Sequence, residues 1–293
     1  MKSLIERLKD EILLCDGAMG TQLLEKGQPS GECPDYWGIK NRQILSAIHN
    51  SYIDAGADMI ITNTFGANRV KLKKFGLEKK VQKINAEAVK IAKQAAKDNI
   101  YVLGDIGPTG EYLEPAGNLK FDDCYNTFLE QARVFESEGV DAIIIETMTD
   151  IEELKAATTA IKENIKLPLI TNMAFSKTNH GSYRTTSGIS IPQMVDYTLL
   201  AGADVIGSNC GIGIREMIEV ITQMRPLSTA FIMAQPNAGS PKLQGGETTY
   251  EETADDFARY APQLIKAGAN IIGGCCGTTP EHIKRIKKAI DVT

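Results

Sequence analysis

Short apolar runs alternate with amphipathic stretches from one end of the chain to the other. The apolar runs are bounded by turn-forming residues and cover positions 12–16, 59–64, 101–106, 142–147, 168–174, 205–209, 231–235 and 270–274. The amphipathic stretches between them include positions 81–96, 124–138, 151–162, 214–224 and 250–267. Apolar runs of this length, separated by helices, are typical of parallel strands buried on both faces. Eight such units predict an α/β fold, a single (β/α)8 TIM-type barrel.

A second architecture, an open doubly wound sheet, would carry a Gly-x-Gly-x-x-Gly turn after its first strand, and the sequence has none there. A weak internal repeat supports the closed barrel instead. In positions 54–58, 137–141, 200–204 and 266–270 a glycine ends a predicted helix just before a strand, where it is expected to adopt the left-handed conformation. These copies precede the second, fourth, sixth and eighth strands. No linker or composition shift divides the sequence, so we expect one domain over residues 1–293.

The predicted strand ends carry the candidate chemistry, as they do in barrels of this class. They are polar, acidic, glycine-rich or thiol-bearing, and they begin at Asp16, Asn63, Asp105, Glu146, Asn172, Ser208, Gln235 and Gly273. Cys210 ends the sixth strand, and Cys275 and Cys276 end the eighth. Because strands six and eight flank strand seven, we expect the three sulfurs to converge on one side of the barrel mouth.

Three converging thiolates are a donor set for Zn²⁺ that leaves a fourth tetrahedral position open, as catalytic zinc sites do. Adjacent residues of a regular strand point to opposite faces. Glycines at positions 273, 274 and 277 permit the backbone conformations that turn both Cys275 and Cys276 to one side. A pair of packed thiols or a strained vicinal disulfide is the alternative interpretation. The pattern predicts a zinc site formed by Cys210, Cys275 and Cys276 at the C-terminal ends of strands six and eight.

Composition narrows the chemistry further. The chain has 3 histidines, and none is expected as a ligand. His49 and His282 fall in predicted helices, and His180 falls in a polar loop at the rim of the barrel mouth. The 32 basic and 37 acidic residues leave a formal charge of −5, which gives no reason to expect nucleic acid or an anionic membrane as a partner.

The N-terminal residues and the remaining cysteines indicate the cellular compartment in which the protein is expected. The first ten residues lack the apolar core and cleavage site of a signal peptide. No stretch approaches the roughly 20 apolar residues that span a bilayer. We therefore expect a cytoplasmic protein without structural disulfides, in which Cys15, Cys33 and Cys124 are buried or incidental thiols.

The motifs at the strand ends resemble those of a known family. Positions 273–283, Gly-Gly-Cys-Cys-Gly-Thr-Thr-Pro-Glu-His-Ile, resemble the closing signature of the zinc-dependent homocysteine S-methyltransferases. Positions 16–21, 63–65, 105–110, 207–210 and 236–239 are similar to the other family motifs, in order. The resemblance covers nearly the whole chain. Positions 47–52 and 55–58 are most similar to the N-terminal homocysteine-binding module of cobalamin-dependent methionine synthase.

The resemblance implies methyl transfer to the thiol of L-homocysteine, giving L-methionine. A free thiol has a reference pKa near 8.5, so only a few per cent is thiolate at neutral pH, whereas a zinc-bound thiol is deprotonated. By this resemblance Cys210, Cys275 and Cys276 bind zinc and act in catalysis, and the substrate sulfur takes the fourth position. Asn237 ends strand seven between the cysteine-bearing strands. Its amide oxygen or a water is expected at that position when substrate is absent.

The amino-acid end of homocysteine needs one anion site and one cation site. The backbone N–H groups of Gly17, Ala18 and Met19 lie where the first strand meets a helix start, which suits the substrate carboxylate. Glu146, at the end of an apolar strand, suits the ammonium group, with Asp16 beside it. The alternatives are an exposed loop carboxylate for Glu146 and a helix cap for Asp16.

The methyl donor is the open part of this prediction. The expected donor is methylcobalamin on a separate module or corrinoid protein, because the chain has no cobalamin-binding His motif. S-methylmethionine, betaine or another corrinoid-linked donor remain alternatives, as does a different thiol acceptor. Positions 176–188 follow the family pattern only loosely, and this loop is expected at the rim where a donor approaches.

Two other function classes stay open. One is a phosphate-binding barrel lyase or isomerase that uses the glycine pairs at 245–246 and 273–274, but it needs a base such as Lys, which no strand end offers. The other is a non-catalytic zinc or redox-sensing thiol protein, which would not respond to homocysteine at the metal.

Overall fold

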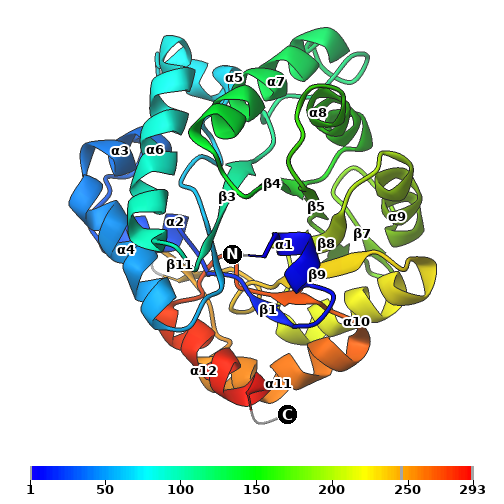
Figure 1. The fold of residues 1–293 in the computed structure, drawn as a ribbon. Coiled ribbons are helices and arrows are strands. Elements are labelled where there is room, and N and C mark those ends of the chain that lie inside the picture. Colours follow the sequence, from blue (N-terminus) through cyan, green and yellow to red (C-terminus); the bar gives the residue numbers. More distant parts are fainter. Residues whose placement is uncertain (1, 245–246, 292–293) are drawn as a thin grey trace.

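The computed structural model describes residues 2–244 and 247–291. Eight parallel strands follow one another around a ring in the order β1-β12-β9-β8-β5-β4-β3-β2 (Figure 1). They are β1 (Leu13–Leu14), β2 (Met59–Ile61), β3 (Tyr101–Ile106), β4 (Ala142–Met148), β5 (Leu169–Met173), β8 (Val205–Asn209), β9 (Phe231–Gln235) and β12 (Ile271–Ile272). A parallel bridge between Cys15 and Met59 joins β1 to β2. The predicted (β/α)8 TIM-type barrel is confirmed.

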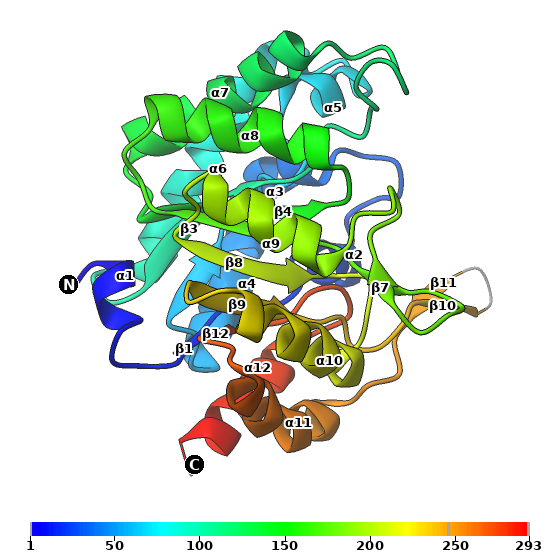
Figure 2. The ribbon, with the colours of Figure 1, turned by 90° about the vertical axis from the view of Figure 1, so that its right-hand side faces the viewer.

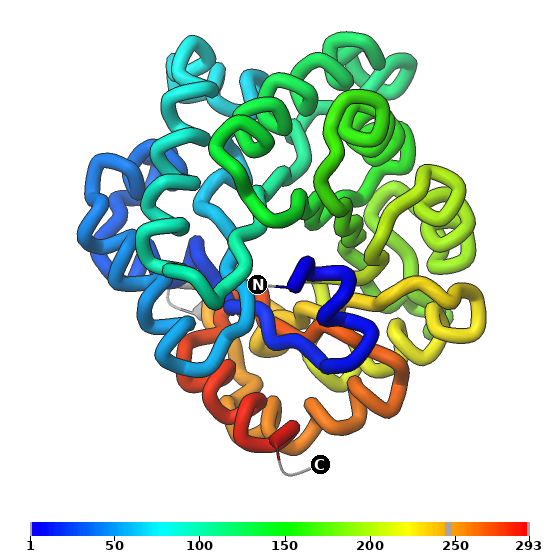
Figure 3. Tube along the Cα trace, in the orientation of Figure 1, coloured from blue at the N-terminus to red at the C-terminus, as the bar shows by residue number. Residues whose placement is uncertain are grey.

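The helices surround this ring (Figure 3). The longer ones are α4 (Arg42–Asp54), α6 (Val81–Ala96), α7 (Phe121–Glu138), α8 (Ile151–Asn164), α9 (Ile191–Leu200), α10 (Ile214–Met224), α11 (Ala254–Ala267) and α12 (Pro280–Ile290). The shorter ones are α1 (Leu4–Arg7), α2 (Gly20–Glu25), α3 (Pro34–Lys40), α5 (Arg69–Lys73) and the 3-10 turns η1 (Glu78–Lys80) and η2 (Arg225–Leu227). The helix predicted at 250–267 begins only at Ala254, because the Thr253 side chain caps it and accepts the N–H of Asp256 at 3.2 Å.

Helix α1 closes the N-terminal end of the barrel. Its Leu4 and the following Leu8 are buried in one cluster with inward-facing strand residues such as Leu13, Met59 and Leu103. In Figures 1 and 2 this helix lies across one end of the strands. The barrel interior is therefore packed at that end, and only the opposite end, where the strands terminate, is left for a site.

The repeated segments form a common connection at the same N-terminal end. Gly56, Gly139, Gly202 and Gly268 all have positive φ, between 72° and 112°, as predicted. The residue that ends each repeat also accepts a hydrogen bond from a backbone N–H of the neighbouring strand. These pairs are Asp58 with Leu14 (2.9 Å), Asp141 with Val102 (2.8 Å), Asp204 with Leu169 (2.9 Å) and Asn270 with Ile232 (3.0 Å). The repeat thus ties the strands together in pairs.

Two antiparallel hairpins extend from the C-terminal end of the barrel (Figure 2). One pairs β6 (Ser176–Lys177) with β7 (Tyr183–Arg184), and the other pairs β10 (Lys242–Gln244) with β11 (Glu247–Thr249). The first lies in the segment expected to be a loop. No helix within the described residues has the length and apolar character needed to cross a membrane.

Candidate active site

A cavity of about 380 Å³ lies at the C-terminal ends of the strands. Its wall includes the residues that end β1, β4, β8 and β12, together with residues of α3 and α5. Every site residue predicted from the sequence lines this cavity except Asn237. The topology brings these residues together, because parallel strands all end on the same side of a barrel.

The three predicted zinc ligands form one thiol cluster in the cavity wall. The Sγ atoms of Cys210, Cys275 and Cys276 all lie within 4.8 Å of one another, and those of Cys210 and Cys276 are 3.9 Å apart. Zinc–sulfur bonds of about 2.3 Å at tetrahedral angles would require sulfurs about 3.8 Å apart. The strand order β12-β9-β8 places the cysteine-bearing strands on either side of β9. The cluster therefore fits a tetrahedral zinc ion with one open position.

Unusual backbone conformations turn the thiols toward one another. Cys210 has φ +59°, in the left-handed region that residues with a side chain seldom adopt. Gly277 has φ +80°, and a Cβ there would lie 2.3 Å from the Tyr250 ring, so only glycine fits. The N–H of Cys275 donates to the carbonyl of Pro236 at 2.8 Å, which holds the cysteine pair against the end of β9.

Hydrogen bonding within the thiol cluster favours a negative charge on one of its thiols, Cys276, while the pKa of Cys210 is raised to about 11 and that of Cys275 well above its ordinary value. Hydrogen bonds from the Cys210 and Cys275 thiols lower the pKa of Cys276 to about 3. Burial instead raises the pKa of Cys33 to about 12, and it raises the pKa of Cys15 well above its ordinary value. Cys124, also buried, lies on α7 and is not part of the cavity wall. In the metal-free cluster one thiolate is thus favoured, at Cys276, and none is favoured at Cys15 or Cys33.

Two carboxyl groups stand in the same cavity. Asp16 accepts the N–H of Ile61 on β2 at 2.9 Å and does not cap a helix, so the capping interpretation is wrong. Burial raises the pKa of Asp16 to about 7. Burial, and then the neighbouring Cys210 and Asp16, raise the pKa of Glu146 to about 8. Within the described chain the Glu146 carboxyl has no hydrogen-bond or ion-pair partner, so it is free to receive one from a ligand.

The backbone N–H groups after β1 are only in part available. The N–H of Ala18 donates to Oγ1 of Thr278 at 3.0 Å, and this hydroxyl in turn donates to the carbonyl of Cys275 at 2.7 Å. Over residues 2–244 and 247–291, the N–H groups of Gly17 and Met19 have no protein acceptor. The expected three donors for a carboxylate are therefore reduced to two.

Asn237 lies behind the cavity wall. Its side chain is 2% exposed, and its Oδ1 atom has no hydrogen-bond partner among the described residues. Its N–H donates to the carbonyl of Ile212 at 2.9 Å, and the next residue, Ala238, donates to the carbonyl of Cys276 at 3.0 Å. A buried amide oxygen without a donor next to the thiol cluster is the kind of atom that a cation or a water satisfies.

The sequence patterns missed several residues of the cavity wall. Lys71 comes from α5, where its Nζ atom lies 4.3 Å from the centre of the Phe65 ring, and burial lowers its pKa. Asp35 comes from α3 and accepts the N–H of Gly66 at 2.9 Å. Asp105, at a predicted strand end but without a predicted role, is 3% exposed, and its Oδ1 atom has no donor in the described structure. Lys71 shows that a base can reach the cavity from a helix, which reading the strand ends alone could not reveal.

The histidines take no part in the cavity wall. His282 lies at the start of α12, where its Nδ1 is 3.0 Å from the Thr279 hydroxyl. His49 is fully buried on α4, and His180 is exposed between β6 and β7. The glycine pair at 245–246, considered for phosphate binding, lies outside the described residues.

The parallel barrel and the thiol-lined cavity at its mouth define a class of barrel enzymes with a candidate metal centre. The sequence model of the homocysteine S-methyltransferase family matches residues 13–290, and the chain belongs to this family. The resemblance seen in the motifs is therefore confirmed.

Individual relatives agree with this assignment. Methionine synthase from Mycobacterium leprae is 29% identical over 309 residues, which cover 98% of this chain but only about a quarter of that protein. The homocysteine methyltransferase MmuM from Escherichia coli has the same fold. Its metallated form matches with a TM-score of 0.80 at 21% identity over 96% of both chains, and its oxidized form with 0.78 at 25% over 98% of both. A methyltransferase from Methanosarcina mazei matches with a TM-score of 0.60 at 12% identity, over 99% of this chain and 97% of that one.

Proposed function

We propose that the protein transfers a methyl group to the thiol of L-homocysteine, giving L-methionine, and that Cys210, Cys275 and Cys276 hold the Zn²⁺ that this reaction needs. One observation carries the proposal: three Sγ atoms within 4.8 Å of one another share a cavity with the Glu146 carboxyl group, which has no hydrogen-bond or ion-pair partner among the described residues. A bound zinc ion would supply the positive charge that keeps the substrate thiol ionised. Because that charge does the activation, no histidine base is required.

The protein groups would orient the amino-acid end of the substrate. Glu146 binds the ammonium group, with Asp16 beside it in the same cavity. The free N–H groups of Gly17 and Met19 bind the carboxylate, while Ala18 fixes this turn through Thr278. Holding both ends of homocysteine places its sulfur in one position relative to the donor, which removes orientational freedom before the methyl transfer.

Asn237 is proposed to act at the metal when no substrate is bound. Its buried Oδ1 atom has no protein donor in the described structure. We assign the fourth zinc position in the substrate-free protein to this oxygen or to a water. X-ray absorption spectra of the zinc in substrate-free wild type and Asn237→Ala distinguish the two. Only direct coordination by Asn237 makes the set of zinc ligands differ between the two proteins.

The donor proposed here is methylcobalamin, carried by a separate module or corrinoid protein. Its support is the similarity to methionine synthase, a protein about four times as long as the matched region. S-methylmethionine and betaine are the alternative methyl donors. A thiol other than homocysteine is the alternative acceptor. We also propose a cytoplasmic location, where three adjacent thiols stay reduced.

The test is a zinc and proton-release titration with L-homocysteine. We expect one zinc per chain and one proton released per homocysteine bound, because the substrate thiol binds as thiolate. L-methionine, which lacks the thiol, is the matched ligand and should release none. A chain that binds no stoichiometric zinc, or binds it without any response to homocysteine, contradicts the proposal and supports a non-catalytic thiol protein.

A second measurement addresses the donor alone. Zinc-loaded protein and homocysteine are incubated separately with methylcobalamin and with S-methylmethionine, and methionine is quantified. Methionine formed from methylcobalamin supports the proposed donor. Methionine formed only from S-methylmethionine contradicts it and identifies S-methylmethionine as the donor.

A further inference from the structure

The turn after β1, residues 16–19, is joined to the cysteine pair after β12 by one hydroxyl group, that of Thr278. Its Oγ1 atom accepts the N–H of Ala18 at 3.0 Å and donates to the carbonyl of Cys275 at 2.7 Å. Thr278 is fully buried. Ala18 lies between the two residues whose free N–H groups are proposed for the substrate carboxylate, and Cys275 is a proposed zinc ligand. One buried side chain therefore connects the two ends of the proposed substrate site.

Tyr52 holds the same two segments from helix α4. Its hydroxyl donates to the carbonyl of Ala18 at 2.7 Å and lies 3.3 Å from the carbonyl of Thr278. The side chain of Tyr52 is fully buried. Together with the bond to Thr278, this contact binds both backbone polar groups of Ala18 to side chains. The turn therefore cannot shift without breaking a buried hydrogen bond, which costs free energy.

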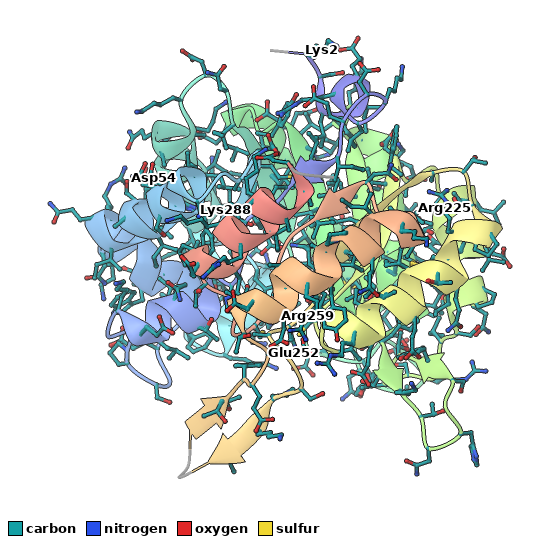
Figure 4. The ribbon with its side chains drawn as sticks, turned by 90° about the horizontal axis from the view of Figure 1, so that it is seen from below. Lys2, Asp54, Arg225, Glu252, Arg259 and Lys288 are labelled. Atoms are coloured by element: carbon teal, nitrogen blue, oxygen red, sulfur yellow. The ribbon has the colours of Figure 1, made fainter. Side chains whose placement is uncertain are left out.

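Helix α4, which carries Tyr52 in its last turn, is packed against α12. A Cβ on Gly56, just after α4, would lie 3.0 Å from Cγ of Lys287 on α12. Figure 4 shows the two helices next to each other, with Asp54 labelled at the end of α4 and Lys288 labelled on α12. The Tyr52 hydroxyl thus reaches the turn from a helix that is itself held in place.

Close contacts also join the turn to the segment that carries the cysteine pair. A Cβ on Gly17 would lie 2.7 Å from Oγ1 of Thr278 and 2.9 Å from the Tyr52 ring. A Cβ on Gly274 would lie 2.3 Å from the same oxygen, and the N–H of Gly274 donates to the carbonyl of Asp16 at 2.9 Å. Because glycine backbone packs directly on these side chains, the turn and the cysteine segment are fixed relative to each other.

We propose that Thr278 and Tyr52 are positioning residues that set the distance between the carboxylate site and the zinc site. They thereby select an acceptor thiol of the length of L-homocysteine over the shorter L-cysteine. The inference rests on the proposed function, since it assumes that the substrate carboxylate binds the turn and that the substrate sulfur binds zinc. L-cysteine has one methylene fewer between sulfur and α-carbon, so it cannot reach both sites when their separation is fixed. One methylene is worth about 10–200-fold in discrimination.

The test measures the Kd values of the zinc-loaded protein for L-homocysteine and L-cysteine by isothermal titration. Thr278→Val keeps the shape of the side chain and removes the hydroxyl. We expect it to bind L-homocysteine about tenfold more weakly and L-cysteine with the wild-type Kd, so that the preference for L-homocysteine falls about tenfold. Thr278→Ser keeps the hydroxyl and should retain the wild-type preference. Equal affinity of the wild type for the two thiols, an unchanged preference in Thr278→Val, or a serine variant as altered as the valine variant would overturn the proposal.

A third ligand separates this role from a merely structural one. The compound 3-aminopropane-1-thiol is homocysteine without its carboxylate, so its sulfur can bind zinc but it has no group for the turn. Its Kd should be the same in Thr278→Val and wild type. A tenfold loss of affinity for this ligand as well would place the damage at the zinc site and contradict the proposal.

Tyr52→Phe tests the second positioning residue and replaces the first test if Thr278→Val does not fold. Tyr101→Phe is the matched control, because this tyrosine is also buried and its hydroxyl also donates to a carbonyl, that of Lys2 at 2.8 Å, at the closed end of the barrel. We expect the preference for L-homocysteine to fall about tenfold in Tyr52→Phe and to stay unchanged in Tyr101→Phe. An unchanged preference in Tyr52→Phe, or an equal fall in both tyrosine variants, contradicts the role of Tyr52.

The outcomes remain distinct from those for the proposed function. A wild type that binds zinc and releases a proton with L-homocysteine, together with unchanged preferences in the variants, overturns only the roles of Thr278 and Tyr52. A wild type without zinc, or without a response to L-homocysteine, overturns the proposed function itself.

Discussion

Asn209 holds Thr147 by two hydrogen bonds, one to its backbone and one to its side chain. The Oδ1 atom of Asn209 accepts the N–H of Thr147 at 2.7 Å, and its Nδ2 donates to Oγ1 of Thr147 at 2.7 Å. Thr147 has φ +59° and directly follows Glu146, at an irregularity in the pairing of β4 with β5. Because the same Nδ2 also donates to Cys275, one amide links the carboxyl-bearing end of β4 to the thiol cluster.

Asn209→Ala is expected to weaken homocysteine binding about tenfold, because two hydrogen bonds that fix the backbone beside Glu146 are lost. Zinc content should stay at one per chain, since all three sulfurs remain. Isothermal titration with L-homocysteine measures the Kd. Asn126→Ala on the exposed face of α7, where the amide only reaches the carbonyl of Asp122, is the matched control and should bind normally. An unchanged Kd in Asn209→Ala would show that the clamp does not position Glu146.

Glu146→Gln is expected to change the pH dependence of stability in the metal-free protein. Burial raises the folded-state pKa of Glu146 from about 4.5 to about 8. The folded state therefore binds more protons than the unfolded state between these values, and stability falls as the pH rises toward 8. Glutamine cannot ionise, so the variant should be more stable than the wild type at pH 8.5, by about 4–5 kcal/mol, and similar to it at pH 4.5. Thermal unfolding across this pH range is the measurement.

The exposed variant Glu32→Gln provides the comparison for that experiment. It should follow the wild-type stability curve at every pH. A Tm difference between Glu146→Gln and wild type that does not vary with pH would mean that Glu146 does not titrate in this range.

Cys275→Ala is expected to abolish stoichiometric zinc binding, because only two thiolates remain in the cluster. Cys124→Ala, which also removes a buried thiol but lies on α7, should keep zinc and lose about 1–2 kcal/mol of stability through the cavity it leaves. Metal analysis after dialysis, paired with denaturant unfolding, separates the two effects. Full zinc retention by Cys275→Ala would remove this cysteine from the ligand set.

The barrel could be predicted because each strand is a separate apolar run. The residues at which the strands end were predicted less accurately. Strand β12 contains only Ile271 and Ile272, against a predicted 270–274, because the following glycines and cysteines turn away from the sheet into the cavity wall. The hairpin β6–β7 was missed because its strands have two residues each and are largely exposed. Such strands leave no alternation of polar and apolar residues to detect.

Some residues of the candidate site could likewise be predicted from the sequence, and others could not. Cys210, Cys275 and Glu146 could be predicted as neighbours because all parallel strands end at one face. Lys71 enters the cavity from a short helix, so a prediction based on strand ends could not include it. The pairing of Asn209 with Thr147 joins residues 62 positions apart, and a strand-terminal asparagine looks like an ordinary turn residue in the sequence.

Asp141 allows a test of the repeated connection without touching the cavity. Its carboxylate accepts the N–H of Val102 at 2.8 Å, and Val102 is buried, so removing the acceptor leaves a strand N–H unsatisfied. Asp141→Ala should therefore lower the free energy of unfolding by about 1–3 kcal/mol. Asp141→Asn keeps an acceptor oxygen, and the fourth repeat already uses an asparagine, Asn270, in the same bond to Ile232. The asparagine variant should thus stay close to wild type in urea unfolding, and both variants should bind zinc and homocysteine normally. Equal destabilisation by the two substitutions would instead assign the stabilisation to the negative charge of Asp141.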